Sequence, residues 1–332
     1  MSGAWEAPRR NRGPMAVSLF WARVQRAVRR QASVAAIVFV LTAGVGLLYG
    51  YVGGVPAQQS APMALAIGLA VALVISIASE LGRNTVTSVA GLRKHLGCVV
   101  LGAAPELTAQ ALRELPPEHR SPLGCLTFQP GSPFATAFRN LQGTIANGKV
   151  VAVIGSLPNE GASTIALGAA ISATQQGRRV LLVDCDMRRR SLTHALVGDV
   201  QAGTLEAADR PQNFRTLIHR EAETGLHFLP AAKLKSVWTT LIGMTGLPIL
   251  IDAMRNAYDL VVLDCPPTLG SADGAMLARL ADGCIIVAAW DDTPIGALRA
   301  SIRALRRGPQ AVTGIYLNRV PSGYRFGRLR PE

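Results

Sequence analysis

The stretch that decides the fold is Val150-Val151-Ala152-Val153-Ile154-Gly155-Ser156-Leu157-Pro158-Asn159-Glu160-Gly161-Ala162-Ser163-Thr164. It begins with an apolar run rich in β-forming residues, which predicts a strand ending at Gly155. A loop of turn-forming residues follows, and a helix is expected over 165–176. A strand, a tight loop and a helix N-terminus form the layout of a phosphate-binding P-loop. The usual pattern ends in Gly-Lys-Ser/Thr, so Ala162 stands at the lysine position.

From residue 149 onward, fully apolar strands alternate with helix-forming segments. Because strands without polar positions are buried on both faces, this pattern predicts an α/β fold with a parallel sheet between two helical layers. The strands expected after the first one are 180–183, 226–229, 260–263, 284–287 and 312–317.

Acidic residues stand at the ends of two of these strands. Asp184 and Asp186 follow the strand at 180–183, and Asp264 follows the strand at 260–263. Ligands of open parallel sheets bind at the carboxyl ends of the strands, so these acids should converge on the P-loop. Ser163, Asp184 and Asp264 could then hold Mg²⁺ and its waters. Each acid taken singly could instead be only a strand-end cap.

The N-terminal part of the chain predicts a membrane anchor. The chain is 49% hydrophobic with a net charge of +13, and residues 1–33 are rich in arginine. Two uncharged apolar stretches, 34–53 and 61–79, are each long enough for a transmembrane helix, and cations flank the hairpin at 34–81. The sequence thus predicts a multi-pass membrane protein with both termini in the cytoplasm. The basic segment either contacts anionic lipids or serves only to set topology.

The remaining segments complete the expected domain organisation. Residues 82–131 are interpreted as a cytoplasmic connector and proline-rich linker, 132–320 as the P-loop domain, and 321–332 as a basic tail. A helix is expected from Phe134 to Ile145. The five widely spaced cysteines indicate reduced thiols, and Cys185, Cys265 and Cys284 should be buried. Low aromatic content and arginines beside the first span argue against nucleic acid as a partner.

The P-loop and the two acidic strand ends together resemble the cytoplasmic domain of bacterial tyrosine kinases (BY-kinases), which belong to the MinD/ParA-like class of P-loop NTPases. The similarity covers residues 96–320. It implies an inner-membrane component of exopolysaccharide or capsule export that works with a polysaccharide co-polymerase. It also implies ATP or ADP and Mg²⁺ as cofactors, with Asp184, Asp186 and Asp264 as the catalytic acids. The nucleotide-binding positions implied by the resemblance are Gly155, Pro158, Glu160, Gly161, Ala162, Ser163, Thr164, Arg188 and Asn318, the last facing the adenine.

Several positions depart from the family pattern. Ala162 replaces the Walker A lysine, and the self-association motif reads Thr136, Arg139, Gln142, although a homo-oligomer stays an open expectation. The tyrosine cluster is reduced to Tyr324, the candidate phosphoacceptor. The lysine normally contacts the β- and γ-phosphates and stabilises the charge that develops during transfer, so its absence should weaken phosphoryl transfer. The cations considered as substitutes are Arg139, Lys149 and Arg188.

These departures leave three functional hypotheses. The leading one is a regulatory or scaffolding pseudokinase of exopolysaccharide assembly, with other membrane proteins of that machinery and membrane lipids as partners. The second is an active ATP-dependent tyrosine autokinase with an unusual P-loop. The third is a ParA/MinD-like positioning ATPase.

Overall fold

The chain divides into two compact units, Met1–Arg83 and Asn84–Glu332. The computed structural model describes residues 36–54, 62–72, 74, 85–139, 141, 148–233, 241–306 and 312–321. Three sequence predictions lie outside the described residues: the basic segment 1–33, Gln142 of the self-association motif, and Tyr324 with nearly all of the tail.

The first unit contains helical residues at 36–52 and 62–72. The two helices approach each other closely where Gly46 faces Ala64. A Cβ built on Gly46 would lie 2.7 Å from the Cβ of Ala64, well inside normal contact distance. A larger residue at position 46 would therefore separate the two helices.

The predicted transmembrane hairpin is wrong for the part of the chain that the structure describes. Within those residues, no helix combines the length and the apolar character that crossing a membrane requires. The stretch predicted as a span over 34–53 is described as helical only over 36–52, which is shorter than the about 20 residues that cross a hydrocarbon core. The sequence prediction rested on apolar composition and on flanking cations, and neither of these determines where a helix begins and ends. The multi-pass inner-membrane localisation that followed from it is corrected accordingly.

The second unit is built on an eight-stranded sheet with the order β1-β8-β7-β2-β6-β3-β5-β4. Neighbouring strands pair in parallel, except that β4 and β5 form an antiparallel hairpin. This confirms the predicted parallel α/β fold. The strands are β1 Val100–Pro105, β2 Val150–Gly155, β3 Val180–Asp184, β4 His219–Arg220, β5 His227–Leu229, β6 Leu260–Cys265, β7 Gly283–Ala289 and β8 Val312–Val320.

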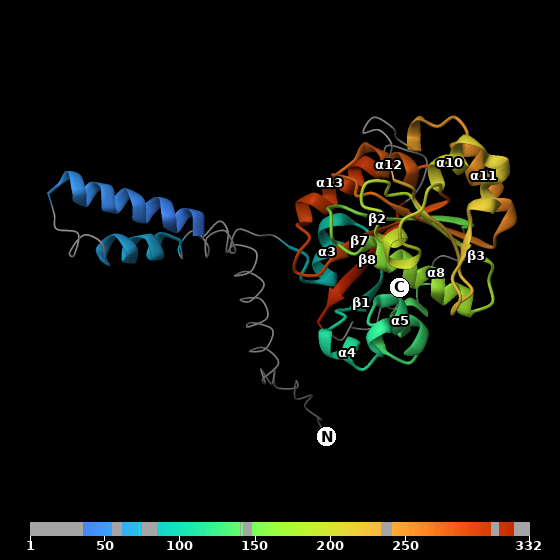
Figure 1. The fold of residues 1–332 in the computed structure, drawn as a ribbon, viewed down its shortest axis with the longest axis horizontal. Helices are drawn as coiled ribbons and strands as arrows, with labels where there is room; N and C mark the ends of the chain where they lie inside the picture. The colour runs from blue at the N-terminus through green and yellow to red at the C-terminus, as the bar shows by residue number, and fades with distance from the viewer. Residues whose placement is uncertain are drawn as a thin grey trace, which may run out of the picture. The chain divides into compact units, whose positions relative to one another are not determined.

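Helices pack on both faces of this sheet (Figure 1). The face covered by α8 also carries α4, α5 and α6, whereas α3 and α10 to α13 contribute to the core on the other face. The α-helices are α3 Val89–Leu96, α4 Ala109–Arg113, α5 Pro122–Phe128, α6 Pro133–Arg139, α8 Ala162–Gln175, α9 Ser191–Leu196, α10 Thr204–Asp209, α11 Leu247–Ala257, α12 Ala272–Ala278 and α13 Ile295–Leu305; the 3-10 helices are η1 Pro117–His119, η2 Pro211–Leu217 and η3 Leu241–Gly243.

Alternate side chains of the central strand β2 pack into the two cores, one on each face of the sheet. Val150, Ala152 and Ile154 belong to one hydrophobic cluster, and Val151 and Val153 belong to the other. Successive side chains of a strand point to opposite faces, so an apolar residue at every position fills both sides. The continuous apolar run is thus explained by a strand with no solvent-facing side.

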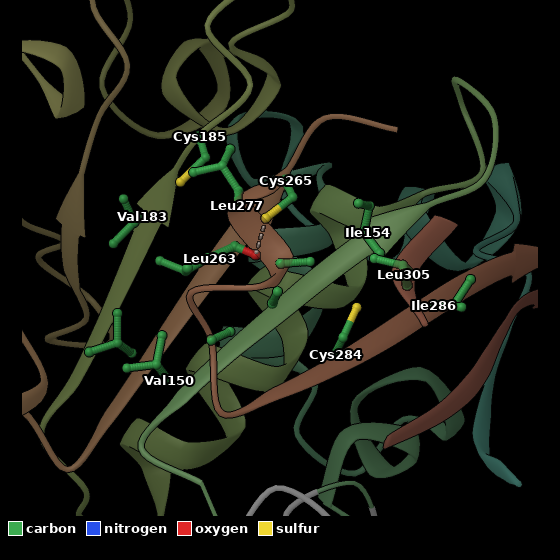
Figure 2. Packing of buried hydrophobic residues seen from close by; sticks show 14 of the residues in the cluster. Val150, Ile154, Val183, Cys185, Leu263, Cys265, Leu277, Cys284, Ile286 and Leu305 are labelled. Atoms are coloured by element: carbon green, nitrogen blue, oxygen red, sulfur yellow. Dashed lines mark hydrogen bonds between the residues drawn. The ribbon is translucent and has the colours of Figure 1, made fainter. Parts of the chain in front are cut away.

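The three cysteines predicted to be buried are buried in the core. Cys185, Cys265 and Cys284 lie among Ile154, Val183 and other apolar side chains in the cluster of Figure 2. The Cys265 thiol donates a hydrogen bond to the Leu263 carbonyl at 3.7 Å. Burial raises the pKa of Cys284 to about 12, so this thiol stays protonated at neutral pH.

The segment 82–131, expected to be a connector and linker, is instead largely structured. Its residues form α3, α4, α5, the 3-10 helix η1 and strand β1, which pairs with β8. The prolines read as turn signals stand at helix starts: Pro117 begins η1, and Pro122 begins α5 after the N-cap Ser121. Proline suits the first helical position because its missing N–H would have no partner there. The helix expected over 134–145 is described only as α6.

Gly168 of α8 is the point of closest contact between α8 and α6. A Cβ at this position would lie 2.4 Å from the ring of Phe138, which is fully buried and stacks on Tyr316. We expect Gly168→Ala to lower the free energy of unfolding by about 1–3 kcal/mol through overpacking, despite the higher helix propensity of alanine. Chemical denaturation followed by circular dichroism measures this change.

The matched control for that substitution is Gly296→Ala in α13. A Cβ at Gly296 would meet no atom within 4 Å. Because glycine costs about 0.5–1 kcal/mol in a helix relative to alanine, this variant should be neutral or more stable. Equal effects of the two substitutions would show that the α8–α6 contact is not tight.

Candidate functional site

The P-loop connects β2 to α8 through two residues with left-handed backbone. Asn159 has φ 68° and Gly161 has φ 91°, and Gly161 is the N-cap of α8. Asparagine tolerates this conformation better than most residues, and glycine adopts it without strain. No side chain caps α8. The first N–H groups of a helix have no partner within the helix, so this turn forms a site suited to an anion.

The buried side chain of Glu160 fixes the shape of the loop. One carboxylate oxygen accepts hydrogen bonds from the backbone N–H of Ser156, at 2.5 Å, and of Leu157, at 3.0 Å. The other accepts a hydrogen bond from the Thr293 hydroxyl at 2.6 Å. Burial raises the pKa of Glu160, although these hydrogen bonds oppose the increase. Glu160 therefore serves the predicted nucleotide site by holding its backbone.

Asn318 supports the same loop from the end of β8. Its side-chain amide donates a hydrogen bond to the Glu160 carbonyl at 2.9 Å and lies almost against the Cα of Gly161. A Cβ on Gly161 would come within 1.9 Å of the Asn318 amide nitrogen, so only glycine fits here. The expected role of Asn318 at an adenine base stays a prediction. Its contribution in this structure is to support the P-loop, as Thr293 does, and Thr293 was not identified from the sequence.

Asp184 and Asp264 are direct neighbours across the β3–β6 pairing. The Asp184 carboxylate is fully buried and accepts hydrogen bonds from the backbone N–H of Asp186 and from both the N–H and the hydroxyl of Thr193. Burial raises the pKa of Asp184 to about 6, although these bonds lower it in part.

Asp264 is buried, and only one of its two carboxylate oxygens takes part in a hydrogen bond. Its carboxylate has a hydrogen bond with Ser163, the second residue of α8, while the Oδ2 atom has no hydrogen-bond partner. Burial and then the nearby Asp184 raise the pKa of Asp264 well above its usual range. A buried carboxylate oxygen without a partner beside a serine hydroxyl is a donor set that suits Mg²⁺. The residues present therefore fit the predicted metal.

Asp186 shapes the chain after β3. Its Oδ1 accepts hydrogen bonds from the backbone N–H of Arg188, at 3.2 Å, and of Arg189, at 3.1 Å. These bonds close a turn that precedes α9. The described residues contain no group of three or more His, Cys, Asp or Glu side chains arranged to hold a metal ion.

The cations at the P-loop differ from the three that the sequence suggested. Arg139 donates to Thr136, and Lys149 lies at the opposite end of β2. The side chain that reaches the loop is Arg189, whose guanidinium donates to the Asn159 side chain at 3.1 Å. Arg189 belongs to the arginine run 188–190, whose sequence is typical of a solvent-exposed helix start. The turn closed by Asp186 brings its side chain to the loop.

A cavity of about 260 Å³ is lined by the P-loop, the turn after β3 and the end of β8. Arg189 and Arg319 contribute the cations, and Glu160 and Asp186 are the acidic residues of its lining. Arg319 forms an ion pair with Asp292 at 3.8 Å. Of the predicted site residues, Asp184 and Asp264 are buried next to the cavity, whereas Arg188 and Asn318 do not line it. Those that do line it are Gly155, Pro158, Glu160, Gly161, Ala162, Ser163, Thr164 and Asp186.

Comparison with known proteins identifies relatives of this domain. A family model described as an AAA domain matches residues 148–304. The chain is 26% identical to EpsB of Ralstonia solanacearum over 275 residues, which is 80% of the chain and 37% of EpsB. It is 30% identical to the succinoglycan biosynthesis transport protein ExoP of Rhizobium meliloti over 199 residues, which is 57% of the chain and 25% of ExoP. The chain thus spans between a quarter and two fifths of the length of these relatives.

Solved structures give the same result for the fold. The kinase domain of the Escherichia coli tyrosine kinase ETK aligns with a TM-score of 0.64 at 19% identity, covering 73% of this chain and 97% of that domain. The VpsO kinase domain aligns with a TM-score of 0.51 at 27% identity, covering 56% of this chain and 93% of that domain. Because the ETK identity is low, that alignment supports the fold alone.

The buried carboxyl of Asp264, whose Oδ2 atom has no hydrogen-bond partner, predicts an effect on stability. We expect Asp264→Asn to raise the free energy of unfolding of the metal-free protein at pH 8, by about 1.4 kcal/mol for each unit of raised pKa. The amide oxygen can still accept the Ser163 hydrogen bond while the buried charge is removed. Since the native pKa lies above the unfolded value of about 3.9, the stabilisation should be absent below about pH 4 and grow as the pH rises.

Thermal unfolding in a chelator, measured from pH 4 to pH 8, checks this expectation. Asp259→Asn is the matched control, because a hydrogen bond from Arg179 holds the pKa of Asp259 below its usual value. This control should not be stabilising at any of these pH values. A stabilisation by Asp264→Asn that is the same at pH 4 and pH 8 would contradict the assigned cause.

Proposed function

The chain is a BY-kinase-like P-loop protein, and from this premise we propose that it is a nucleotide-responsive component of bacterial exopolysaccharide or capsule assembly with weak or absent kinase activity. The observation that carries the proposal is Ala162 in an otherwise well-formed P-loop. The loop backbone, the N-terminus of α8 and the two buried carboxylates are all in place. Only the cation that would act on the transferring phosphate is missing from its usual position.

Binding and phosphoryl transfer depend on this lysine to different degrees. The backbone N–H groups at the start of α8 can still hold phosphate oxygens of ATP or ADP. A charge-assisted hydrogen bond contributes about 1.5–3 kcal/mol, so its absence weakens binding without abolishing it. Losing one preorganised donor to the transition state costs about 10²–10³ in rate. The proposed protein therefore binds nucleotide and transfers phosphate poorly.

Mg²⁺ would be held by Ser163 and Asp264 with bound waters, near Asp184. When bound, the ion would neutralise charge on the β- and γ-phosphates. The hydroxyl of Ser163 and the free Oδ2 of Asp264 are the groups available to it. Asp184 keeps the acidic pair in place through its bonds with Thr193.

Arg189 supports the second candidate function, a weakly active tyrosine autokinase. Its guanidinium lies at the rim of the P-loop, bonded to Asn159, and Arg319 lines the same cavity. Arginine carries a permanent charge and binds phosphate through two parallel hydrogen bonds. A cation arriving from the turn after β3 would replace part of the role of the lysine from outside the loop.

The proposed setting in polysaccharide assembly is supported by the relatives. ExoP is named a succinoglycan biosynthesis transport protein, and the present chain matches a quarter of its length. The partners we propose are a separate polysaccharide co-polymerase and other proteins of exopolysaccharide assembly. The P-loop would report nucleotide state to them.

The first prediction of this proposal concerns affinity for nucleotide. Calorimetric titration of the full chain with Mg-ATP is expected to give measurable but weak binding. Ala162→Lys should tighten binding about tenfold or more, because it restores a charge-assisted hydrogen bond to the phosphates. If neither protein binds, the nucleotide proposal is wrong. If only the lysine variant binds, the native protein acts without nucleotide.

The second prediction tests Arg189 as the cation at the loop. Arg189→Gln is expected to weaken Mg-ATP binding about threefold to tenfold, the effect of losing a partly exposed ionic hydrogen bond. Arg188→Gln is the matched control, because Arg188 is its sequence neighbour but does not line the cavity. Autophosphorylation that is present in the native protein and absent after Arg189→Gln would favour the kinase candidate. Equal effects of both variants would exclude a specific role for Arg189.

A further inference from the structure

A second, larger cavity lies at the amino-terminal ends of β3 and β5, opposite to the strand ends that carry the P-loop. Its volume is about 620 Å³. It opens beside Val180, the first residue of β3, and His227, the first residue of β5, whereas the P-loop cavity lies at the strands' carboxyl ends. At about 3.3 Å per residue, β3 alone separates the two by roughly 15 Å. The two cavities are therefore different sites.

Four arginines line this second cavity, and no acidic residue does. Two of them have partners: Arg179 forms an ion pair with Asp259 at 2.9 Å, and Arg178 donates to the Asp259 carbonyl at 2.9 Å. Arg215 and Arg220 differ, because within the described residues neither has a carboxylate within 4 Å. Two guanidinium groups thus line the cavity without a counter-charge.

The turn of the β4–β5 hairpin explains why Arg220 stays unpaired. The adjacent acid, Glu221, directs its carboxylate into the turn, where it accepts hydrogen bonds from the N–H and the hydroxyl of Thr224. Arg220 lies directly across from His227 in the antiparallel pair. Side chains of directly opposed residues lie on the same face of a sheet, so Arg220 and His227 are placed together.

The interior of the cavity combines hydrogen-bonding groups with apolar walls. The Tyr258 hydroxyl and the His227 Nδ1 atom are 2.8 Å apart, and the two rings meet edge to face. Tyr258 is buried, and Val180 and Ile218 form apolar parts of the wall. Arg215 comes from η2 on the other side. Cations therefore converge from separate elements on a partly apolar space.

We propose that this cavity binds a small organic diphosphate, that is, a ligand with two linked phosphates and an apolar or sugar-like remainder. Guanidinium groups match phosphate oxygens through paired hydrogen bonds, and two unpaired arginines beside two further ones suit more than one phosphate. The volume falls in the range of pockets that enclose small organic ligands. The proposal does not depend on nucleotide binding at the P-loop.

Calorimetric titration of the full chain with pyrophosphate tests the proposal. We expect binding that weakens at least tenfold in Arg215→Gln and in Arg220→Gln. Arg220→Lys should also weaken it, since lysine keeps the charge but cannot make the paired hydrogen bonds. Inorganic phosphate and sulfate should bind at least tenfold more weakly than pyrophosphate, because each engages fewer of the arginines.

Two controls separate this site from general charge and from the P-loop. Arg210→Gln removes an exposed arginine just before η2 that pairs with Asp209 and does not line the cavity. Gly161→Ala forces a clash with Asn318 in the P-loop. Arg210→Gln should leave pyrophosphate binding within about twofold of the native protein. Gly161→Ala should leave the part of the binding that depends on Arg215 and Arg220, whatever it removes at the P-loop.

Several results would overturn the proposal. One is the absence of binding at millimolar pyrophosphate, and another is loss of binding in Gly161→Ala with retention in both cavity variants. A third is equal weakening by Arg210→Gln, or equal affinity for sulfate and pyrophosphate, which would indicate only a diffuse positive surface. Circular dichroism of each variant verifies that the fold is intact, and a variant that does not fold is replaced by its lysine counterpart.

Discussion

The pairing of β3 with β6 is the constraint on which the candidate site depends. In this register Asp184 and Asp264 lie side by side at the ends of two buried strands, and their like charges cannot both be ionised without cost. Thr193 stabilises one of them, while the other contacts Ser163 at the start of α8 and keeps a free oxygen. A cation bound beside these two carboxylates would reduce the repulsion between them. The P-loop follows β2, which pairs with β6, so it lies at the same end of the sheet.

The P-loop is well formed although Ala162 stands where the usual pattern has a lysine. The shape comes from Glu160, whose carboxylate bonds the loop backbone and Thr293, and from Asn318, which closes against Gly161. None of these contacts involves position 162. Position 162, which would act on the ligand, is therefore independent of Glu160 and Asn318, which hold the loop backbone. A substitution at position 162 can leave the shape of the loop unchanged.

The sequence predicted those features that depend on local pattern. Uninterrupted apolar runs such as 150–154 indicated buried parallel strands, and the acids after β3 and β6 were correctly expected to meet. Features that depend on three-dimensional context were not predicted. Arg189 reaches the loop only because Asp186 turns the chain, and Pro122 begins a helix where a linker was expected. The apolar stretch at 34–53 fitted a membrane span by composition, but hydropathy carries no information on where a helix begins and ends.

The hairpin that ends the sheet has a consequence for how copies of this domain can meet. Strand β4 is only two residues long, and both of them, His219 and Arg220, are exposed. Short edge strands with cationic side chains resist the addition of further strands from another molecule. At this edge, growth of the sheet into a continuous intermolecular β-structure is therefore disfavoured. Self-association through β4 is therefore not expected, and the other edge of the sheet is formed by a different strand, β1.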